Sequence, residues 1–460
     1  MPVPLPNILR KLLQQKSLME TVGNASVLVL TRFGGAVANF IFTLLLAQYL
    51  APSQVGFVMT ALSLGALASL FTTLNMENGA VRHLLQPLEK GNTAEAAGFM
   101  AYGWRVLRIA TPIVIVGLIA FMLLSQSLKN ELTRQEFWAV FFLAISVPML
   151  AMLRLGTRWA HALSKIKRSM LSWALFRPLI LCLAVGGAAL LFGGLRVDIV
   201  LLANAVACLV ALVIQHFLLR SAFAFTKDAE PDTSRSREWM STGLYLSVTI
   251  LLIDYFQNVV IVTSALGLSD GDVARLAVAL RFIGFLRMGL MAVNMAVSPR
   301  VSKAISAERM GDAQHLLSQS THLKFWPTVI VTALVWWLAP FLVGLFGEDY
   351  EAAAWPLRLF ALLPLVAAFF GPSIMVLNVT GRQQDIFRLS AVSLGLLVVS
   401  VPVAGISLGL NGAAAAAVLS VFVWEWALFD RTKRDTGIDA SIMGAMKLLL
   451  PKKLTAEPQA

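Results

Sequence analysis

The sequence predicts an all-α membrane protein that crosses the bilayer about twelve times, and three observations lead to this fold class. Of its 460 residues, 58% are hydrophobic and only 13% are charged, and the mean hydropathy is +0.76. Soluble globular domains are far less apolar. Apolar runs of membrane-spanning length recur along the whole chain, and its basic residues alternate between successive loops.

A helix needs about 20 consecutive apolar residues to cross the hydrocarbon core of a bilayer. Twelve runs reach this length, at 25–50, 55–76, 106–125, 137–156, 171–192, 198–219, 242–267, 273–297, 324–346, 355–377, 386–407 and 411–430. Only short loops remain between them, so we expect no sizeable soluble domain. Both cysteines, Cys182 and Cys208, lie inside apolar runs, which predicts no disulfide framework.

The net charge of +12 is unevenly distributed over the two sides of the membrane. With a cytoplasmic N-terminus, 29 of the 37 Lys and Arg residues fall in inner segments, among them the run 154–168 and Lys324. The outer loops hold only Lys129, Arg134, Arg196, Arg275 and Arg358. This asymmetry predicts that both termini are cytoplasmic. The positive charge then orients the protein and contacts anionic lipid, so we expect no nucleic-acid partner.

A weak internal repeat relates the two halves of the chain. The segments at 80–96, 161–171 and 193–199 match those at 298–315, 377–387 and 409–415, in the same order and at offsets of about 215 to 219. A repeat of six helices enters the membrane twice from the same side, which predicts two lobes related by a pseudo-two-fold axis along the membrane normal, with a central cleft. The predicted parts are an N-terminal lobe 1–219, a cytoplasmic linker 220–241, a C-terminal lobe 242–436 and a cytoplasmic tail 437–460.

Few ionisable residues fall well inside the apolar runs, and three of the four are cations. They are Arg32, Asp254, Arg281 and Arg287. An arginine at the bilayer centre costs about 2.5 to 3.5 kcal/mol on insertion scales. By helical rise, Arg281 and Arg287 lie roughly 12 and 20 Å from the outer end of their run, too deep for both to reach water.

Helical spacing places these charges on polar stripes. Arg32 and Asn39 share a face of the first run, Asp254 lies on a polar face of the seventh, and Arg287 shares a stripe of the eighth with Asn294. Such faces in a bundle border a water-filled cavity or one another. A purely structural ion-pair network is the alternative, but three cations exceed one anion.

An excess of guanidinium groups favours an anionic substrate, and phosphate or pyrophosphate suits guanidinium donors well. The predicted substrate-binding residues are Arg32, Asn39, Arg281, Arg287 and Asn294, and the predicted ion-coupling residue is Asp254. No spacing typical of a catalytic or metal site is present, and no nucleotide-binding loop, so we expect no enzyme activity, metal or cofactor.

Several segments resemble the polysaccharide-transport branch of the multidrug/oligosaccharidyl-lipid/polysaccharide exporter superfamily, the Wzx-type O-antigen flippases. They are LLLAQYLAPSQVGFVMTALSL (44–64), APFLVGLFGEDYEAAAWPLRLFALLPL (339–365), VLNVTGRQQDIF (376–387) and GLNGAAAAAVLS (409–420). The resemblance extends over essentially the whole chain.

The resemblance implies a flippase that moves an undecaprenyl-pyrophosphate-linked oligosaccharide across the bacterial inner membrane by alternating access. On this interpretation the arginines bind the pyrophosphate, the sugars occupy the hydrated cleft, and an ion gradient acts through Asp254. The implied partners are membrane lipids and the polymerase and chain-length proteins of an O-antigen or exopolysaccharide pathway.

Three alternatives remain. A lipid II flippase of the same superfamily usually has fourteen spans, and residues 437–450 are too short for a thirteenth. A drug exporter of the superfamily is expected to have a less cationic cleft. A membrane glycosyltransferase or polymerase needs a large outer loop with catalytic groups, and the outer loops here are short.

Overall fold

The computed structural model describes residues 30–127, 133–227 and 229–449, and over these ranges every regular element is a helix. Ten helices are long and apolar enough to cross a membrane, or eleven when the bent pair α9 and α10 is counted as one span. The predicted all-α, multi-pass fold class is confirmed. The first 29 residues and the last eleven lie outside the described ranges.

The last long helix contains two of the twelve predicted spans. α16 (Gln383–Thr436) has a non-helical residue at Gly409, with φ 65° and ψ −154°, inside the predicted outer loop GLNG. The two arms run back along each other, since Trp424 donates to the hydroxyl of Ser390 and Arg431 pairs with Asp385. With the two arms of α16 counted separately, the described chain has twelve helical segments at the positions of the twelve predicted apolar runs.

The chain forms two compact units, which we describe separately. Unit 1 comprises residues 1–50 and 64–247, and unit 2 comprises 51–63 and 248–460. α2 (Pro52–Thr73) and α9 (Ser236–Ile253) each contribute to both units. The predicted lobe boundaries at 219 and 242 and the pseudo-two-fold axis stay predictions.

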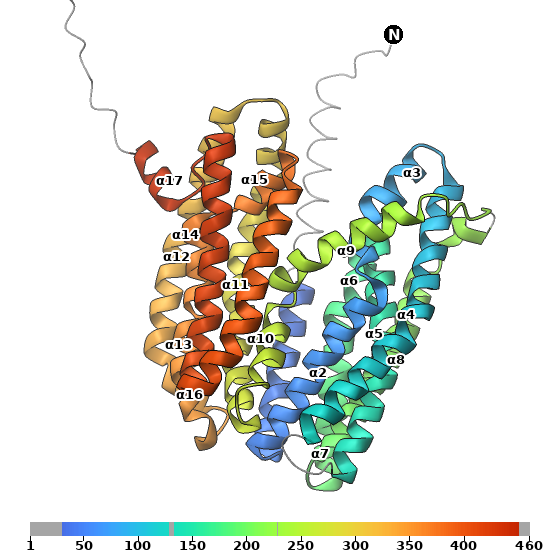
Figure 1. The fold of residues 1–460 in the computed structure, drawn as a ribbon, viewed down its shortest axis with the longest axis vertical. Helices are drawn as coiled ribbons and strands as arrows, with labels where there is room; N and C mark the ends of the chain where they lie inside the picture. The colour runs from blue at the N-terminus through green and yellow to red at the C-terminus, as the bar shows by residue number, and fades with distance from the viewer. Residues whose placement is uncertain (1–29, 128–132, 228, 450–460) are drawn as a thin grey trace, which may run out of the picture. The chain divides into compact units, whose positions relative to one another are not determined.

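Unit 1 is built on long apolar helices joined by short turns (Figure 1). Besides the helix Leu30–Tyr49 and part of α2, its elements are η1 (Met76–Gly79), η2 (Val81–Leu85), α3 (Gln86–Glu89), α4 (Thr93–Ser127), α5 (Arg134–Ala162), α6 (Ile166–Met170), η3 (Leu171–Phe176), α7 (Arg177–Phe192), α8 (Val197–Leu219), η4 (Ala224–Lys227) and most of α9. α5 packs closely along α8, and a capping box of Thr133 and Glu136 fixes its start.

The segment predicted as a linker is attached to unit 1. The amide of Asp232 donates to the carbonyl of Ala94 at the start of α4. Trp239, in the first turn of α9, is buried, with its ring 5.5 Å from that of Phe99. Burial of such a large aromatic side chain holds this polar stretch against the bundle.

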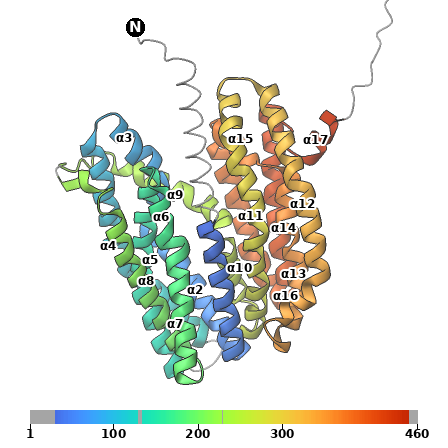
Figure 2. The ribbon, with the colours of Figure 1, turned by 180° about the vertical axis from the view of Figure 1, so that it is seen from behind.

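Unit 2 contains the other long helices (Figure 2). Its elements are α10 (Phe256–Ser264), α11 (Asp270–Ser306), α12 (Met310–Gly344), η5 (Glu348–Ala353), α13 (Ala354–Phe360), α14 (Leu362–Phe370), α15 (Ser373–Val379), α16 and α17 (Ile442–Leu449). Ser269 caps α11 by accepting from the amide of Asp272. The turn after α14 requires glycine, because Gly371 has φ 75° and a Cβ there would collide with the carbonyl of Ala440.

Candidate functional site

Four polar side chains from three helices of unit 2 form the candidate site. Arg287 and Asn294 belong to α11, Lys324 to α12 and Glu425 to the second arm of α16. The Lys324 Nζ donates to the Oδ1 of Asn294 at 2.9 Å. The carboxylate of Glu425 interacts electrostatically with both Arg287 and Lys324. We call these four residues the unit 2 cluster.

Burial divides the cluster into a fixed part and an accessible part. The Lys324 side chain is only 4% exposed, and Glu425 is half-buried. Arg287 and Asn294 are exposed. A ligand therefore has direct access to the α11 side chains, while Lys324 acts from within the packed helices.

Helix geometry sets the spacing of the cluster. Arg287 and Asn294 are seven residues apart, about two turns, so they project from the same side of α11 at heights that differ by roughly 10 Å. Lys324 reaches across from α12, which packs along α11. The cluster thus extends along the helix axis, over a distance suited to more than one polar group of a ligand.

The charges of the unit 2 cluster do not cancel. Two cations, Arg287 and Lys324, accompany one carboxylate, Glu425. Over the described part of the chain, no ion pair within 4.0 Å joins these three groups, so their attraction acts through space and leaves N–H donors for a ligand. Unneutralised cations on apolar helices of a membrane protein, here one buried and one exposed, mark a candidate anion site.

Two other predicted residues also belong to unit 2. Arg281 is half-buried in α11, and its Nη2 lies 3.2 Å from the sulfur of Met59 in the unit 2 part of α2. Asp254 is exposed in the turn between α9 and α10, where the predicted seventh span bends by 77°. Helices broken within the membrane place backbone dipoles and side chains at ion and substrate sites.

The remaining predicted site residues belong to unit 1. Arg32 is exposed on the helix Leu30–Tyr49. Asn39 donates to the carbonyl of Gly35 in the same helix at 2.9 Å, and Thr43, on the same face one turn further along, is buried. Gly35 itself packs against the backbone of Ala174, so much of this stripe lies against other helices of unit 1.

Two members of the unit 2 cluster were not among the predicted site residues. Lys324 was predicted to end an inner segment at the start of an apolar run, and the structure buries it inside α12. The apolar stretch FWPTVIV directly after Lys324 is the sequence feature that indicates its burial. Glu425 stands alone among aromatic and aliphatic residues in VFVWEWALF, which is unusual for a carboxylate in a span.

The interpretation of one basic run was wrong for one of its residues. The run 154–168 was predicted to be a solvated inner loop, but Arg154 lies inside α5, is 6% exposed and forms an ion pair with the buried Glu77. Its other terminal nitrogen lies 3.4 Å from the hydroxyl of Ser69. Glu77 follows α2 through a left-handed turn at Leu74 and Asn75, which directs the carboxylate toward α5.

The acidic and sulfur-bearing side chains do not assemble into a metal centre. Across residues 30–127, 133–227 and 229–449, no group of three or more His, Cys, Asp or Glu side chains is arranged to hold a metal ion. The unit 2 cluster has one carboxylate and two cations, a set that repels divalent metals.

Comparisons with known proteins agree with this architecture. A family model described as MatE matches residues 246–406, about a third of the chain. No curated protein matches the chain by sequence.

Solved structures of transporters share the fold. The chain is similar to a multidrug resistance MATE family transporter of the MOP superfamily in its inward-facing conformation, with a TM-score of 0.69, 13% identity, and coverage of 90% of this chain and 98% of that one. It is also similar to the lipid II flippase MurJ, with a TM-score of 0.68, 11% identity, and coverage of 92% and 91%.

A third similar structure is a MOP superfamily transporter from Pyrococcus furiosus, described as having a binding pocket of reversed polarity. Its TM-score is 0.61 at 13% identity, with coverage of 90% of this chain and 95% of that one. At such identities these likenesses show a MATE-like fold alone.

Proposed function

We propose that this protein is a membrane transporter for an anionic lipid-linked substrate, and that the substrate is an undecaprenyl-pyrophosphate-linked oligosaccharide moved across the bacterial inner membrane. The observation that carries the proposal is the positive balance of the unit 2 cluster, in which Arg287 and Lys324 face a single carboxylate. The match to the MatE family model and the MATE-like fold support transport as the class of function.

In this proposal Arg287 binds the pyrophosphate first, because it is the accessible cation. Guanidinium donors form paired, charge-assisted hydrogen bonds with phosphate oxygens. Lys324 supplies a second positive charge from within the helices, and Asn294 offers an exposed amide to the headgroup or the first sugar. Glu425 limits the positive charge, which lets the anion leave again.

Transport by alternating access needs a source of energy, and we propose an ion gradient that acts through Asp254. The carboxylate is exposed at the break between α9 and α10, so it is accessible to an ion from water. Ion binding at Asp254 would stabilise one bend angle between α9 and α10 relative to another conformation of this helix pair.

The test is a complementation series in bacteria that make the surface polysaccharide, with each variant replacing the natural gene. Arg287→Gln and Lys324→Gln are expected to lower surface polysaccharide about tenfold or more, the value of one charge-assisted contact. Arg309→Gln is the matched control, since Arg309 is an exposed cation paired with Asp312. Immunoblots of membrane fractions confirm that every variant is inserted.

The location of the stalled intermediate separates the alternatives. The proposal expects lipid-linked repeat units to accumulate on the cytoplasmic side. Normal polysaccharide in both variants contradicts it. Flipped but unpolymerised units outside would indicate an enzyme, accumulated peptidoglycan precursors a lipid II flippase, and a loss of drug resistance alone a drug exporter.

A further inference from the structure

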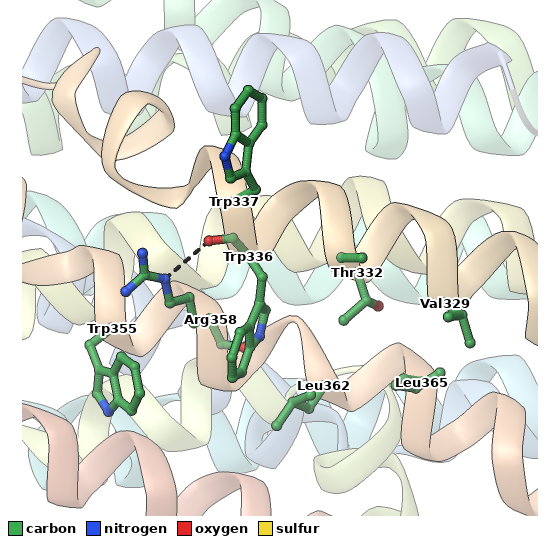
Figure 3. A pocket seen from close by; sticks show the side chains of 9 residues that line it. Val329, Thr332, Trp336, Trp337, Trp355, Arg358, Leu362 and Leu365 are labelled. Atoms are coloured by element: carbon green, nitrogen blue, oxygen red, sulfur yellow. Dashed lines mark hydrogen bonds between the residues drawn. The ribbon is translucent and has the colours of Figure 1, made fainter.

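An open groove lies on unit 2 between α12 and the segment formed by α13 and α14 (Figure 3). Its volume is about 590 Å³. Three tryptophans and one arginine line one end, and small or aliphatic side chains line the rest. The lining residues are Val329, Thr332, Ala333, Trp336, Trp337, Trp355, Arg358, Leu362 and Leu365.

The arginine at this end is held in place by its neighbours. The Nε of Arg358 donates to the carbonyl of Trp336 at 3.1 Å, and the indole N–H of Trp336 donates to the carbonyl of Arg358 at 2.7 Å. The guanidinium carbon lies 5.8 Å from the ring centre of Trp355. These contacts leave both Nη groups of Arg358 without a hydrogen bond to another described residue, and Figure 3 shows them pointing away from Trp336.

The rest of the groove offers a ligand an apolar surface. Val329, Ala333, Leu362 and Leu365 carry no polar side-chain atoms. The one hydroxyl, on Thr332, donates to the carbonyl of Ala361 at 3.2 Å. A ligand here therefore gains from an apolar chain, with polar recognition confined to the end that holds Arg358 and the tryptophan indoles.

The side chains around the groove are typical of a surface that faces lipid near the edge of a membrane. Ile330, Leu334, Trp337 and Phe341 of α12 are exposed apolar side chains, and Trp337 is 78% exposed. Arg358 comes seven residues, or roughly 10 Å of helix, after the acidic Glu351 of η5. Tryptophan and arginine are typical of this depth, where the hydrocarbon core meets the headgroups.

We propose that this groove binds an anionic phospholipid of the surrounding bilayer. Its phosphodiester binds the Nη groups of Arg358, and one acyl chain lies along the apolar part of the groove. One free guanidinium edge complements the single charge of a phosphodiester. The open, shallow form of the groove suits a lipid that exchanges with the bilayer. The inference does not depend on the substrate proposed above, whose binding is assigned to other residues.

The experiment uses the full-length protein in nanodiscs of phosphatidylcholine, with phosphatidylglycerol carrying brominated acyl chains added in increasing mole fraction. Bromine quenches nearby tryptophan fluorescence. We expect brominated phosphatidylglycerol to quench the protein more than brominated phosphatidylcholine at the same mole fraction, because it is enriched in the groove. Trp337→Phe is expected to remove much of this difference, because Trp337 lines the groove, is 78% exposed and makes none of the contacts that hold Arg358.

Two variants test the groove itself. Arg358→Gln is expected to raise the phosphatidylglycerol fraction needed for half-maximal quenching about tenfold, the effect of losing one charge-assisted contact. Ala333→Phe fills the apolar part of the groove at an exposed helix position and leaves Arg358 unchanged. It is expected to abolish the preference for phosphatidylglycerol over phosphatidylcholine even if Arg358→Gln folds poorly. Arg196→Gln is the control, since Arg196 is an exposed cation of unit 1 paired with Asp198.

Several outcomes overturn the proposal. Equal quenching by the two brominated lipids in the natural protein excludes a selective site. Preserved selectivity in both groove variants excludes this location, and its loss in Arg196→Gln shows a general surface-charge effect. Displacement of phosphatidylglycerol by undecaprenyl pyrophosphate at an equal mole fraction assigns the groove to a polyprenyl pyrophosphate instead.

Discussion

The two units differ in how neighbouring cations balance the charge of a carboxylate inside the helix bundle. In unit 1, Glu77 and Arg154 form a direct ion pair in which both side chains are buried, and we call it the closed pair. In unit 2, Glu425 interacts with two cations without a direct ion pair, and one of them, Arg287, is exposed. The difference teaches that a charge inside a span is evidence of a binding site only where its neighbours leave it unneutralised.

The largest effect is expected from breaking the closed pair. Glu77→Gln preserves shape but leaves the positive charge of Arg154 buried without its partner, which destabilises a protein by about 3 to 5 kcal/mol. Thermal unfolding of the purified protein in detergent measures the loss as a lower midpoint. Transport defects of this variant should follow the loss of folded protein.

Two further variants control this prediction. Glu238→Gln removes a more exposed partner of Arg82 and Arg235, where pairs contribute about 0 to 1 kcal/mol, and should shift the midpoint little. Combining Glu77→Gln with Arg154→Met removes both charges and should recover most of the stability. An unchanged midpoint in Glu77→Gln alone contradicts the idea of a closed structural pair.

A smaller effect is expected from a change in the unit 2 cluster. Glu425→Gln removes the only carboxylate among its four residues, so the site becomes more positive and the fold loses no direct ion pair. Binding of undecaprenyl pyrophosphate should tighten about three- to tenfold, a change of about 1 kcal/mol in a partly solvated site. Titration of the purified protein, with Glu348→Gln as an exposed control, measures it. Weaker binding would mean that Glu425 positions the cations.

The smallest effect concerns a titrating group at the edge of unit 1. Burial lowers the pKa of His83, with Glu238 opposing and Arg82 reinforcing the shift. The folded state binds this proton less readily than the unfolded chain. The free energy of unfolding is therefore highest well above pH 6.5 and decreases as the pH drops through and below that value. His83→Gln should flatten this slope between pH 7 and 5, measured by unfolding midpoints. An unchanged slope would exclude His83 as its source.

Hydropathy and charge distribution were enough to predict the fold class. Each apolar run had to be a helix, because backbone groups in lipid must satisfy their hydrogen bonds within the segment. The turn at Gly409 was predicted as the outer loop GLNG, because the apolar residues from 386 to 430 are too many for a single crossing of the bilayer. Arg287 and Asn294 were placed on one stripe of α11 by helical period alone.

What only the tertiary structure decided is how each charge is balanced. Arg154 and Lys324 both looked like inner-side basic residues, yet one is neutralised by Glu77 and the other reaches Asn294 in a net positive cluster. Asp254 lay within a predicted continuous span, and the structure places it at a 77° bend. The physical reason is that membrane insertion depends on properties summed along each segment, whereas the environment of a charge depends on side chains that other helices bring to it.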